Sequence, residues 1–363
     1  MGLVDAIHHG SVMAGDPRRM EGASLSPGGV PALGPWQGNV HIVRQTYGDI
    51  SYVGRLLPFR RAVVETLSTD AYGFRNPSYR EGEAFDAVII GDCFLEGRDG
   101  DLFHKHLERA SGMKVYNYNH RRPRDFFSDA RFAAKQPRFL IMERIERGFD
   151  DHYFQWFMNP GLLPEETLSD WDRIESRVYR WGNVFSHSFF MESLQWGLAT
   201  FHYRVEKRLP GSVPLIVPAL GMLFLAEETT AHSLTVAERG LPAVLDSLSS
   251  LDAMCRARNI QLIVLMVPDK FSIYGQWASG REVAENRGDI LRPALVSGLA
   301  ERKIPFVDIM PLYKARSALS DSLLYELDDT RWTPLGKRLA AEEFSRQLSI
   351  FTNATGVDDR GPK

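Results

Sequence analysis

Short apolar runs alternate with amphipathic segments along the middle of the chain. The run Ala87 to Ile90 stops at Gly91-Asp92, which predicts a strand buried on both faces and followed by a turn. In the segment 241–258 apolar residues recur at spacings of three and four, which predicts a helix. The same criteria predict strands at 87–90, 114–118, 139–142, 222–225, 261–267 and 306–308, and helices at 101–110, 125–135, 241–258, 290–302 and 335–348. Strands that alternate with helices indicate an α/β fold, in which one parallel sheet carries helices on both faces.

The alternation is interrupted between Asp150 and Pro210, where aromatic residues are frequent and no strand pattern is present. We expect this segment to be a helical insertion that packs on the sheet. Residues 1–37 are rich in Gly, Pro, Ser and Ala, which predicts a disordered leader. The expected organisation is therefore one domain over residues 38–350, followed by a flexible tail at 351–363.

Composition limits the kinds of protein to consider. At 363 residues with 44% hydrophobic content, the chain is long enough to bury a large core. The net charge of -3 argues against a protein that binds nucleic acid or other polyanions over its whole surface. The leader contains no apolar run long enough for a signal peptide, and the apolar segment 213–226 is too short to span a bilayer. We therefore expect a cytoplasmic protein without a membrane span.

The two cysteines, Cys93 and Cys255, are too few for a disulfide framework and do not lie at metal-ligand spacing, so no metal or cofactor is expected. Cys255 lies on the apolar face of the helix predicted at 241–258, and we interpret it as a core residue. Cys93 follows the strand at 87–90, at the carboxyl end where open α/β sheets bind their ligands. A turn between a strand and a helix favours a thiolate, so Cys93 is either a nucleophile or a small buried residue.

The segment around Cys93 resembles the Gly-Asp-Ser-Leu opening block of the SGNH (GDSL-type) hydrolases, with cysteine in place of the nucleophilic serine. In this chain it reads Gly91-Asp92-Cys93-Phe94. The segment 72–76 resembles the Gly-Phe-Arg segment that often precedes this block in bacterial members, and the segments 137–147, 267–274 and 329–336 resemble the branch that contains the alginate-type polysaccharide O-acetyltransferases. The resemblance implies a three-layer sandwich with a parallel sheet, and a protein that transfers or hydrolyses acyl groups.

The last of these blocks, Asp329-Thr330-Arg331-Trp332, departs from the family at one catalytic position. The family has an orienting aspartate and a histidine base, whereas this chain has Asp329 at the acid position and Arg331 at the base position. Arginine stays protonated and accepts no proton, so the usual triad is absent. One hypothesis is a thiolate of Cys93 held by the Arg331 guanidinium, which Asp329 positions through a bidentate pair. The other is a site that has lost catalysis, in which Arg331 binds an anion or pairs with Asp92.

The chain also departs from the family pattern at the residues that form the oxyanion hole. The family has a glycine after the second strand and an asparagine after the third, and neither is present here. The backbone N–H of Cys93, with Asn119 and Asp92 in support, is the predicted replacement. Basic residues follow the second strand and indicate either a solvated loop or a site for a phosphate, carboxylate or uronate group. The residues predicted to contact substrate are His120, Arg121, Arg122, Arg124, Lys270 and Trp332.

Three functions stay open at this point. The favoured hypothesis is acyl transfer through Cys93 to or from a hydroxylated substrate that is anionic or carbohydrate-like. The second is a protein that binds such a ligand without catalysis. The third is an ordinary esterase with His120 as its base, for which His120→Ala abolishes turnover. The expected partners are this substrate and an acyl donor, with no nucleic acid.

Overall fold

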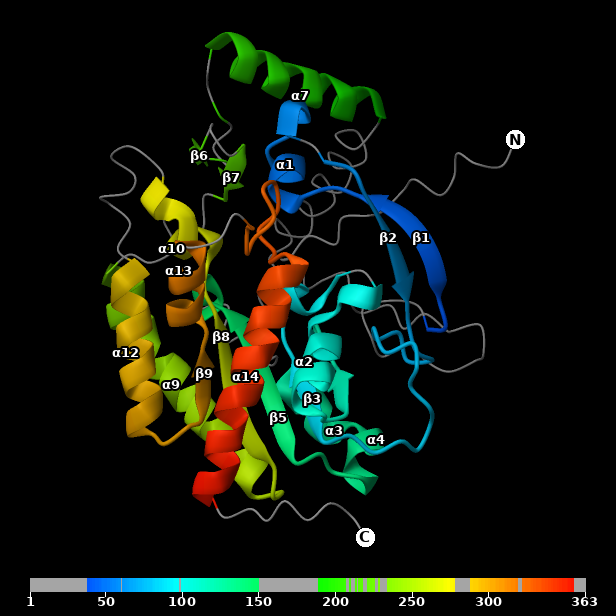
Figure 1. Cartoon of the computed structure of the whole chain (residues 1–363), viewed down its shortest axis with the longest axis vertical. Coiled ribbons are helices and arrows are strands. Elements are labelled where there is room, and N and C mark those ends of the chain that lie inside the picture. The colour runs from blue at the N-terminus through cyan, green and yellow to red at the C-terminus, as the bar shows by residue number, and fades with distance from the viewer. Residues whose placement is uncertain are drawn as a thin grey trace, which may run out of the picture.

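A central parallel sheet organises the molecule (Figure 1). The computed structural model describes residues 38–59, 61–97, 99–149, 189–206, 209, 213, 215–217, 221–225, 228, 234–277, 288–318 and 322–355. The predicted leader, most of the predicted insertion and the end of the predicted tail lie outside these residues. The sheet has the order β4-β3-β5-β8-β9, with strands β3 (Ala87–Ile90), β4 (Val115–Asn117), β5 (Phe139–Ile145), β8 (Gln261–Val267) and β9 (Phe306–Asp308).

Neighbouring strands of this sheet run parallel throughout, so their carboxyl ends lie at one edge. Ile90 of β3 pairs with Met142 of β5, and Ile145 of β5 pairs with Val267 of β8. The residues that follow β3, β4 and β5 therefore meet at the edge where α/β proteins bind ligands.

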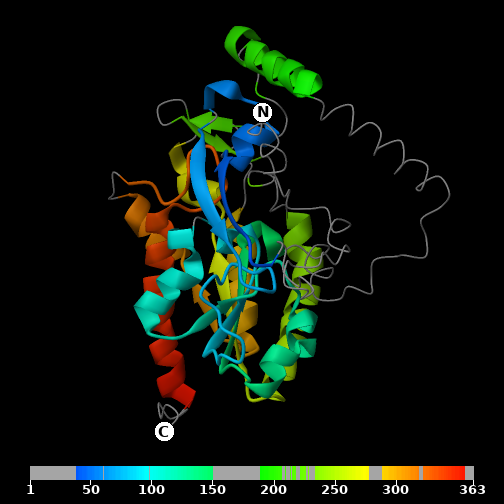
Figure 2. The same ribbon diagram turned by 90° about the vertical axis from the view of Figure 1, so that its right-hand side faces the viewer.

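Two helical layers cover the sheet, because both faces of its strands are apolar. Ala87 and Ile89 face a core shared with α2 (Phe103–Ser111) and α14 (Pro334–Thr355). Val88 and Ile90 face a second core, shared with α9 (Leu234–Arg256) and α12 (Gly288–Glu301). Figure 2 shows α14 and α2 on one side of the sheet and α9 on the other. The predicted three-layer α/β architecture with a parallel sheet is confirmed.

Most predicted elements are present with shifted ends. Three strands are exceptions: those predicted at 87–90, 261–267 and 306–308 match the observed bounds of β3, β8 and β9. The remaining helical elements are α1 (Asp49–Val53), η2 (Leu57–Phe59), η3 (Cys93–Leu95), η4 (Asp99–Asp101), α3 (Pro123–Ser128), α4 (Ala130–Ala134), η5 (Glu146–Phe149), α7 (Phe189–Phe201), η7 (His202–Glu206), α10 (Lys270–Tyr274), η8 (Gly275–Trp277) and α13 (Met310–Ser317). Among the described residues, no helix combines the length and the apolar character needed to cross a membrane.

Three local predictions were wrong. The helix expected at 125–135 is divided at Asp129, which has an extended backbone and caps α4 by accepting the N–H of Arg131 at 3.0 Å. The helix expected at 101–110 begins only at Phe103, and the Asp101 carboxylate before it binds Lys337 Nζ and His106 Nε2, each at 2.8 Å. The strand predicted at 222–225 is present as β7 (Met222–Phe224), but it pairs antiparallel with β6 (Leu215–Val217) in a separate small sheet and not in the parallel sheet.

The amino-terminal part of the described chain forms a hairpin that the sequence patterns did not indicate. Strands β1 (His41–Thr46) and β2 (Val63–Ser68) pair antiparallel, and α1 lies between them in sequence. The hairpin leads into the residues that precede β3. Its connection carries α1 to the loop before α14, where the Ser51 N–H donates to the Asp328 carbonyl at 3.1 Å.

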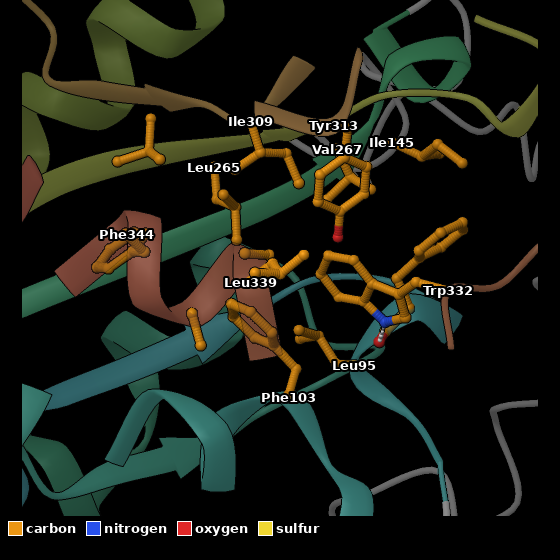
Figure 3. Close-up of a cluster of buried hydrophobic side chains, with 14 of the residues drawn as sticks. Leu95, Phe103, Ile145, Leu265, Val267, Ile309, Tyr313, Trp332, Leu339 and Phe344 are labelled. Atoms are coloured by element: carbon orange, nitrogen blue, oxygen red, sulfur yellow. Dashed lines mark hydrogen bonds between the residues drawn. The ribbon is translucent and has the colours of Figure 1, made fainter. Parts of the chain in front are cut away.

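Trp332 anchors the loop that precedes α14 (Figure 3). Its side chain is only 1% exposed, and its ring stacks on Phe103 of α2 with the centroids 5.0 Å apart. Its indole N–H donates to the carbonyl of Phe94 at 2.8 Å. Because Phe94 directly follows Cys93, this anchor holds the loop of Asp329 and Arg331 beside the predicted nucleophile.

Candidate active site

Cys93 lies just beyond the carboxyl end of β3, at the first residue of η3. The carboxylate of Asp92 caps this turn by accepting the N–H of Phe94 at 3.0 Å. The Asp92 N–H in turn donates to Oε2 of Glu143, a fully buried residue of β5, at 3.1 Å. Gly91 permits this approach, because a Cβ at that position would lie 2.2 Å from the same Glu143 oxygen. Hydrogen bonds of the Asp92 carboxylate and of the Asp92 N–H therefore both fix the turn that carries the thiol.

Asp329 and Arg331 form the bidentate pair that the sequence predicted. The guanidinium Nε donates to Asp329 Oδ1 at 2.9 Å, and a terminal nitrogen donates to Oδ2 at 2.6 Å. Burial acts to raise the pKa of Asp329, but the charge and hydrogen bonds of Arg331 lower it by more. Asp329 stays ionised and Arg331 stays protonated, so neither takes up a proton at neutral pH.

A further carboxylate, Asp49 of α1, joins this pair, and the sequence analysis did not identify it. Its Oδ1 accepts the N–H of Thr330 at 2.8 Å, and its Oδ2 accepts the Thr330 hydroxyl at 2.5 Å. Its own N–H donates to Asp329 Oδ2 at 3.3 Å. Asp49 lies 280 residues from Asp329 in sequence, and its short helix has no motif that would have shown the contact.

The environment of Cys93 does not favour a resting thiolate. Burial raises the pKa of the thiol, the carboxylate of Asp92 raises it further, and the lowering effect of Arg331 is smaller than their sum. Asp49 and Glu96 also raise the pKa of Cys93. The expected thiolate at rest is therefore not supported, because several carboxylates oppose the single guanidinium. Cys255, interpreted as core, is buried and unpaired with another cysteine.

Asn119 and His120 lie beside the nucleophile turn and share one partner. His120 Nε2 is 3.1 Å from Glu96 Oε1, and Asn119 Nδ2 donates to the same oxygen at 3.3 Å. His120 has a φ of 57°, the left-handed conformation that glycine adopts most easily. His120 thus has a glycine-like backbone in the segment after β4, where the resemblance led us to expect a glycine.

The basic residues after β4 are placed differently from one another. Arg121 lies 3.9 Å from Asp125 in an ion pair, Arg122 is the residue before α3, and Arg124 is exposed on α3. All three lie on the segment that follows the carboxyl end of β4. The predicted alternative pairing of Arg331 with Asp92 is not present, since Arg144 takes that role at 3.7 Å.

Lys270 and Trp332 are structural in their contacts. Lys270 is fully buried and donates from Nζ to the carbonyls of Leu327 and Asp329, at 2.9 and 3.1 Å. Burial lowers the pKa of Lys270 to about 8. Trp332 is enclosed in the core. Both side chains hold the loop of Asp329 and Arg331 in place, and both are too buried to contact a ligand.

One family model matches the carboxyl-terminal part of the chain, residues 220–358, and is described as the SGNH hydrolase-like domain of the acetyltransferase AlgX. The match contains Asp329 and Arg331, at the positions where the sequence resemblance placed the acid and the base. Residues 220–358 of this chain are similar to the SGNH hydrolase-like domain, and the parallel sheet has the α/β fold that this resemblance predicts. Because the matched family is one of acetyltransferases, acyl transfer or hydrolysis is the chemistry that the match indicates.

Solved structures similar to the SGNH-like domain have low sequence identity to it. A protein of the G-D-S-L family from Desulfitobacterium hafniense is 12% identical, with 72% of this chain and 97% of that chain covered and a TM-score of 0.35. The lipase/acylhydrolase from Enterococcus faecalis is 9% identical, with 73% and 96% covered and a TM-score of 0.34. No curated protein matches the chain.

No group of three or more histidine, cysteine or acidic side chains in the described part of the SGNH-like domain is arranged to hold a metal ion. Buried charges do gather beyond β5 and β8, where Arg147 pairs with Asp269 and lies 3.5 Å from Glu228. Burial raises the pKa of Glu228 to about 8, against the lowering effect of Arg147. Arg147 of this cluster interacts electrostatically with Cys93.

The raised thiol pKa predicts slow alkylation at neutral pH. With iodoacetamide, the rate of Cys93 modification should increase up to and beyond pH 9, as followed by peptide mass. Asp92→Asn should accelerate the reaction at pH 8, because asparagine still caps the turn but carries no charge. Cys255, whose pKa burial raises to about 12, is an internal control that should not react. Half-maximal reactivity below pH 8 would contradict the prediction.

Proposed function

We propose that the SGNH-like domain transfers an acyl group through a thioester on Cys93. The observation that carries this proposal is the position of the thiol, at the carboxyl end of β3 beside the Asp329–Arg331 pair. In the first step the thiol loses its proton, Sγ bonds to the acyl carbon, and the leaving group departs with a proton. In the second step a hydroxyl of the acceptor attacks the thioester, and Sγ leaves and is reprotonated.

The oxyanion of each step needs hydrogen-bond donors near Sγ. Within the described residues, the backbone N–H of Cys93 donates to no protein acceptor, so it is available for this role. The Arg331 guanidinium, 26% exposed in its side chain, is a second group that favours developing negative charge. Asn119 is a weaker candidate, because its Nδ2 already donates to Glu96.

The charges around Cys93 bear on the substrate. Asp92, Asp49 and Glu96 raise the thiol pKa, and Arg331 is the one cation among the leading charge effects on it. We therefore propose an uncharged hydroxylated acceptor, such as a sugar hydroxyl, at the sulfur itself. An anionic group elsewhere on the same substrate would fit the rim of Arg121, Arg122 and Arg124. Action in the cytoplasm remains a prediction from the composition of residues 1–37.

Intact mass after mixing with 4-nitrophenyl acetate tests the thioester. The wild-type protein should gain one acetyl group, Cys93→Ala should gain none, and a hydroxylated acceptor should remove the group faster than water does. His120→Ala belongs in the same series, because His120 with Glu96 resembles a base with an orienting carboxylate. If His120→Ala alone abolishes hydrolytic turnover, the esterase hypothesis replaces acyl transfer.

The second candidate function is ligand binding without catalysis. It is favoured by the raised thiol pKa and by the full engagement of Arg331 with Asp329. If the wild type takes up no acetyl group between pH 6 and pH 10, this function is preferred. Calorimetric titration with acidic and neutral oligosaccharides would then identify the ligand class.

A further inference from the structure

A protonated thiol needs a proton acceptor before it can react, and the family's histidine is absent from this chain. Arg331, which occupies that position, is excluded because its guanidinium stays protonated. The groups whose charges act most on Cys93 are Asp92, Arg331, Asp49 and Glu96. The acceptor must therefore be sought among three carboxylates.

Two of these carboxylates, Asp92 and Glu96, are already engaged in hydrogen bonds or ion pairs within the protein. Asp92 caps the Phe94 N–H and faces Arg144, so a proton on it would weaken the turn that carries the thiol. Glu96 is held by His120 and Asn119. Burial acts to raise the pKa of Glu96, but His120 and two arginines lower it to about 2, which makes it a poor base.

Asp49 differs from both in its geometry. It is held in place by two hydrogen bonds from a single residue, Thr330, so its orientation is fixed without an ion pair of its own. It adjoins the Asp329–Arg331 pair through the 3.3 Å hydrogen bond from its N–H. Asp49 and Cys93 are both partly exposed, and the charge of Asp49 acts on the thiol.

We propose that Asp49 is the general base of the SGNH-like domain, accepting the Cys93 proton directly or through one water molecule. The inference rests on the proposed acyl transfer. The Asp49 carboxylate takes the proton from Sγ as Sγ bonds to the acyl carbon, and returns it to the departing group. It then takes the proton of the acceptor hydroxyl during deacylation and returns it to Sγ. Each cycle leaves Asp49 ionised, and no further reactant is needed.

The electrostatics agree with this role. Burial, and next the charge of Asp329, raise the pKa of Asp49 to about 6, while Arg331 and Thr330 limit the rise. Two adjoining carboxylates thus have pKa values shifted in opposite directions, an arrangement typical of acid and base assignments in active sites. The charged or titratable groups that face Asp49 are Asp329 and Arg331 from the loop before α14, Cys93 from η3, Lys270 from α10, and Glu228.

His120 is less suited to this role. Burial acts to lower the pKa of His120, but its hydrogen bond and charge interaction with Glu96 raise it. The groups that act most on His120 are Glu96, Asp92 and Arg144. Its Nε2 is occupied by Glu96, and His120 is not among the leading charge effects on the thiol.

The test is the pH dependence of Cys93 acetylation by 4-nitrophenyl acetate, followed by intact mass between pH 5 and pH 9. The wild-type rate should increase through a midpoint near pH 6, where Asp49 loses its proton. Asp49→Asn should lack this midpoint and react about 100-fold more slowly at pH 7. Thr330→Val removes a hydrogen bond that lowers the Asp49 pKa, so the midpoint should move to higher pH, and Thr330→Ser should restore it.

Three outcomes overturn the proposal, and they are distinguishable. An acetyl adduct that forms on Asp49→Asn with the wild-type midpoint excludes Asp49 as the base and leaves the thioester intact. An unchanged midpoint in Thr330→Val, with the thermal unfolding temperature preserved, excludes it independently of Asp49→Asn. A wild type that is not acetylated at any pH overturns the proposed function and this inference together.

Discussion

The Arg331→Ala variant should be less stable than the wild type by about 3 kcal/mol at pH 7, because it leaves the Asp329 carboxylate buried without its cation. This loss lies at the low end of the range for breaking a buried ion pair, because about a quarter of the Arg331 side chain (26%) is exposed. The measurement is the urea midpoint of unfolding at constant slope.

The stability lost in Arg331→Ala should decrease as the pH falls. In the wild type the pKa of Asp329 is depressed, so its stabilising contribution is present above the unfolded value of about 3.9 and lost as pH falls through the folded value. Without the charge and side-chain hydrogen bonds of Arg331, burial acts to raise the Asp329 pKa instead. The variant should therefore approach wild-type stability as the pH falls from 7 to 4 and the carboxyl takes up a proton.

The double variant Asp329→Asn/Arg331→Ala is the matched control for this prediction. It removes both charges, so it should be more stable than Arg331→Ala at pH 7 and should show little of the pH dependence. Equal urea midpoints for the single and double variants at pH 7 would mean that the pair is not a buried charge pair in solution.

Trp332→Ala should cost about 3–5 kcal/mol of stability, the usual range for removing a buried aromatic side chain. The substitution opens a cavity against Phe103 and leaves the Phe94 carbonyl without its indole donor. The thermal unfolding temperature measures this effect. Because Phe94 adjoins Cys93, the loss of packing should also slow acetylation of the thiol.

Trp277→Ala is the control for tryptophan removal, since Trp277 is 40% exposed and should change stability far less. Trp332→Phe separates the two possible roles of Trp332. If the side chain contacts substrate, as the sequence analysis expected, this variant should raise KM while the protein remains folded. An unchanged KM with reduced stability agrees with the buried position.

The sheet was the most predictable part of the molecule. The runs at 87–90, 261–267 and 306–308 are continuous apolar segments between turn residues, and a strand buried on both faces gives such a run. Cys93 could be placed beyond β3 for the same reason. The Asp329–Arg331 pair was predictable because a two-residue spacing lets both side chains meet across one turn.

Contacts between distant segments were not predictable in this way. Asp49 reaches Thr330 only because the β1–β2 hairpin carries α1 to the far end of the chain, and no local pattern encodes that approach. Asp92, Asp49 and Glu96 together raise the pKa of the Cys93 thiol. An expectation based on Arg331 alone therefore gave a shift of this pKa in the wrong direction. Asp101 has the residue type of a helix cap, yet Lys337 competes for its carboxylate from α14.

The 280-residue separation of Asp49 and Asp329 has a consequence for the way the site is made on the ribosome. At about 5–20 residues per second, Asp49 waits roughly 15 to 60 s before Asp329 has been synthesised. During that time β3 and β4 can already pair, while Asp49 has neither Asp329 nor Thr330 to bind. The candidate active site is thus among the last parts of the protein to be completed, and a chain truncated before residue 329 would have the thiol without the Asp329–Arg331 pair.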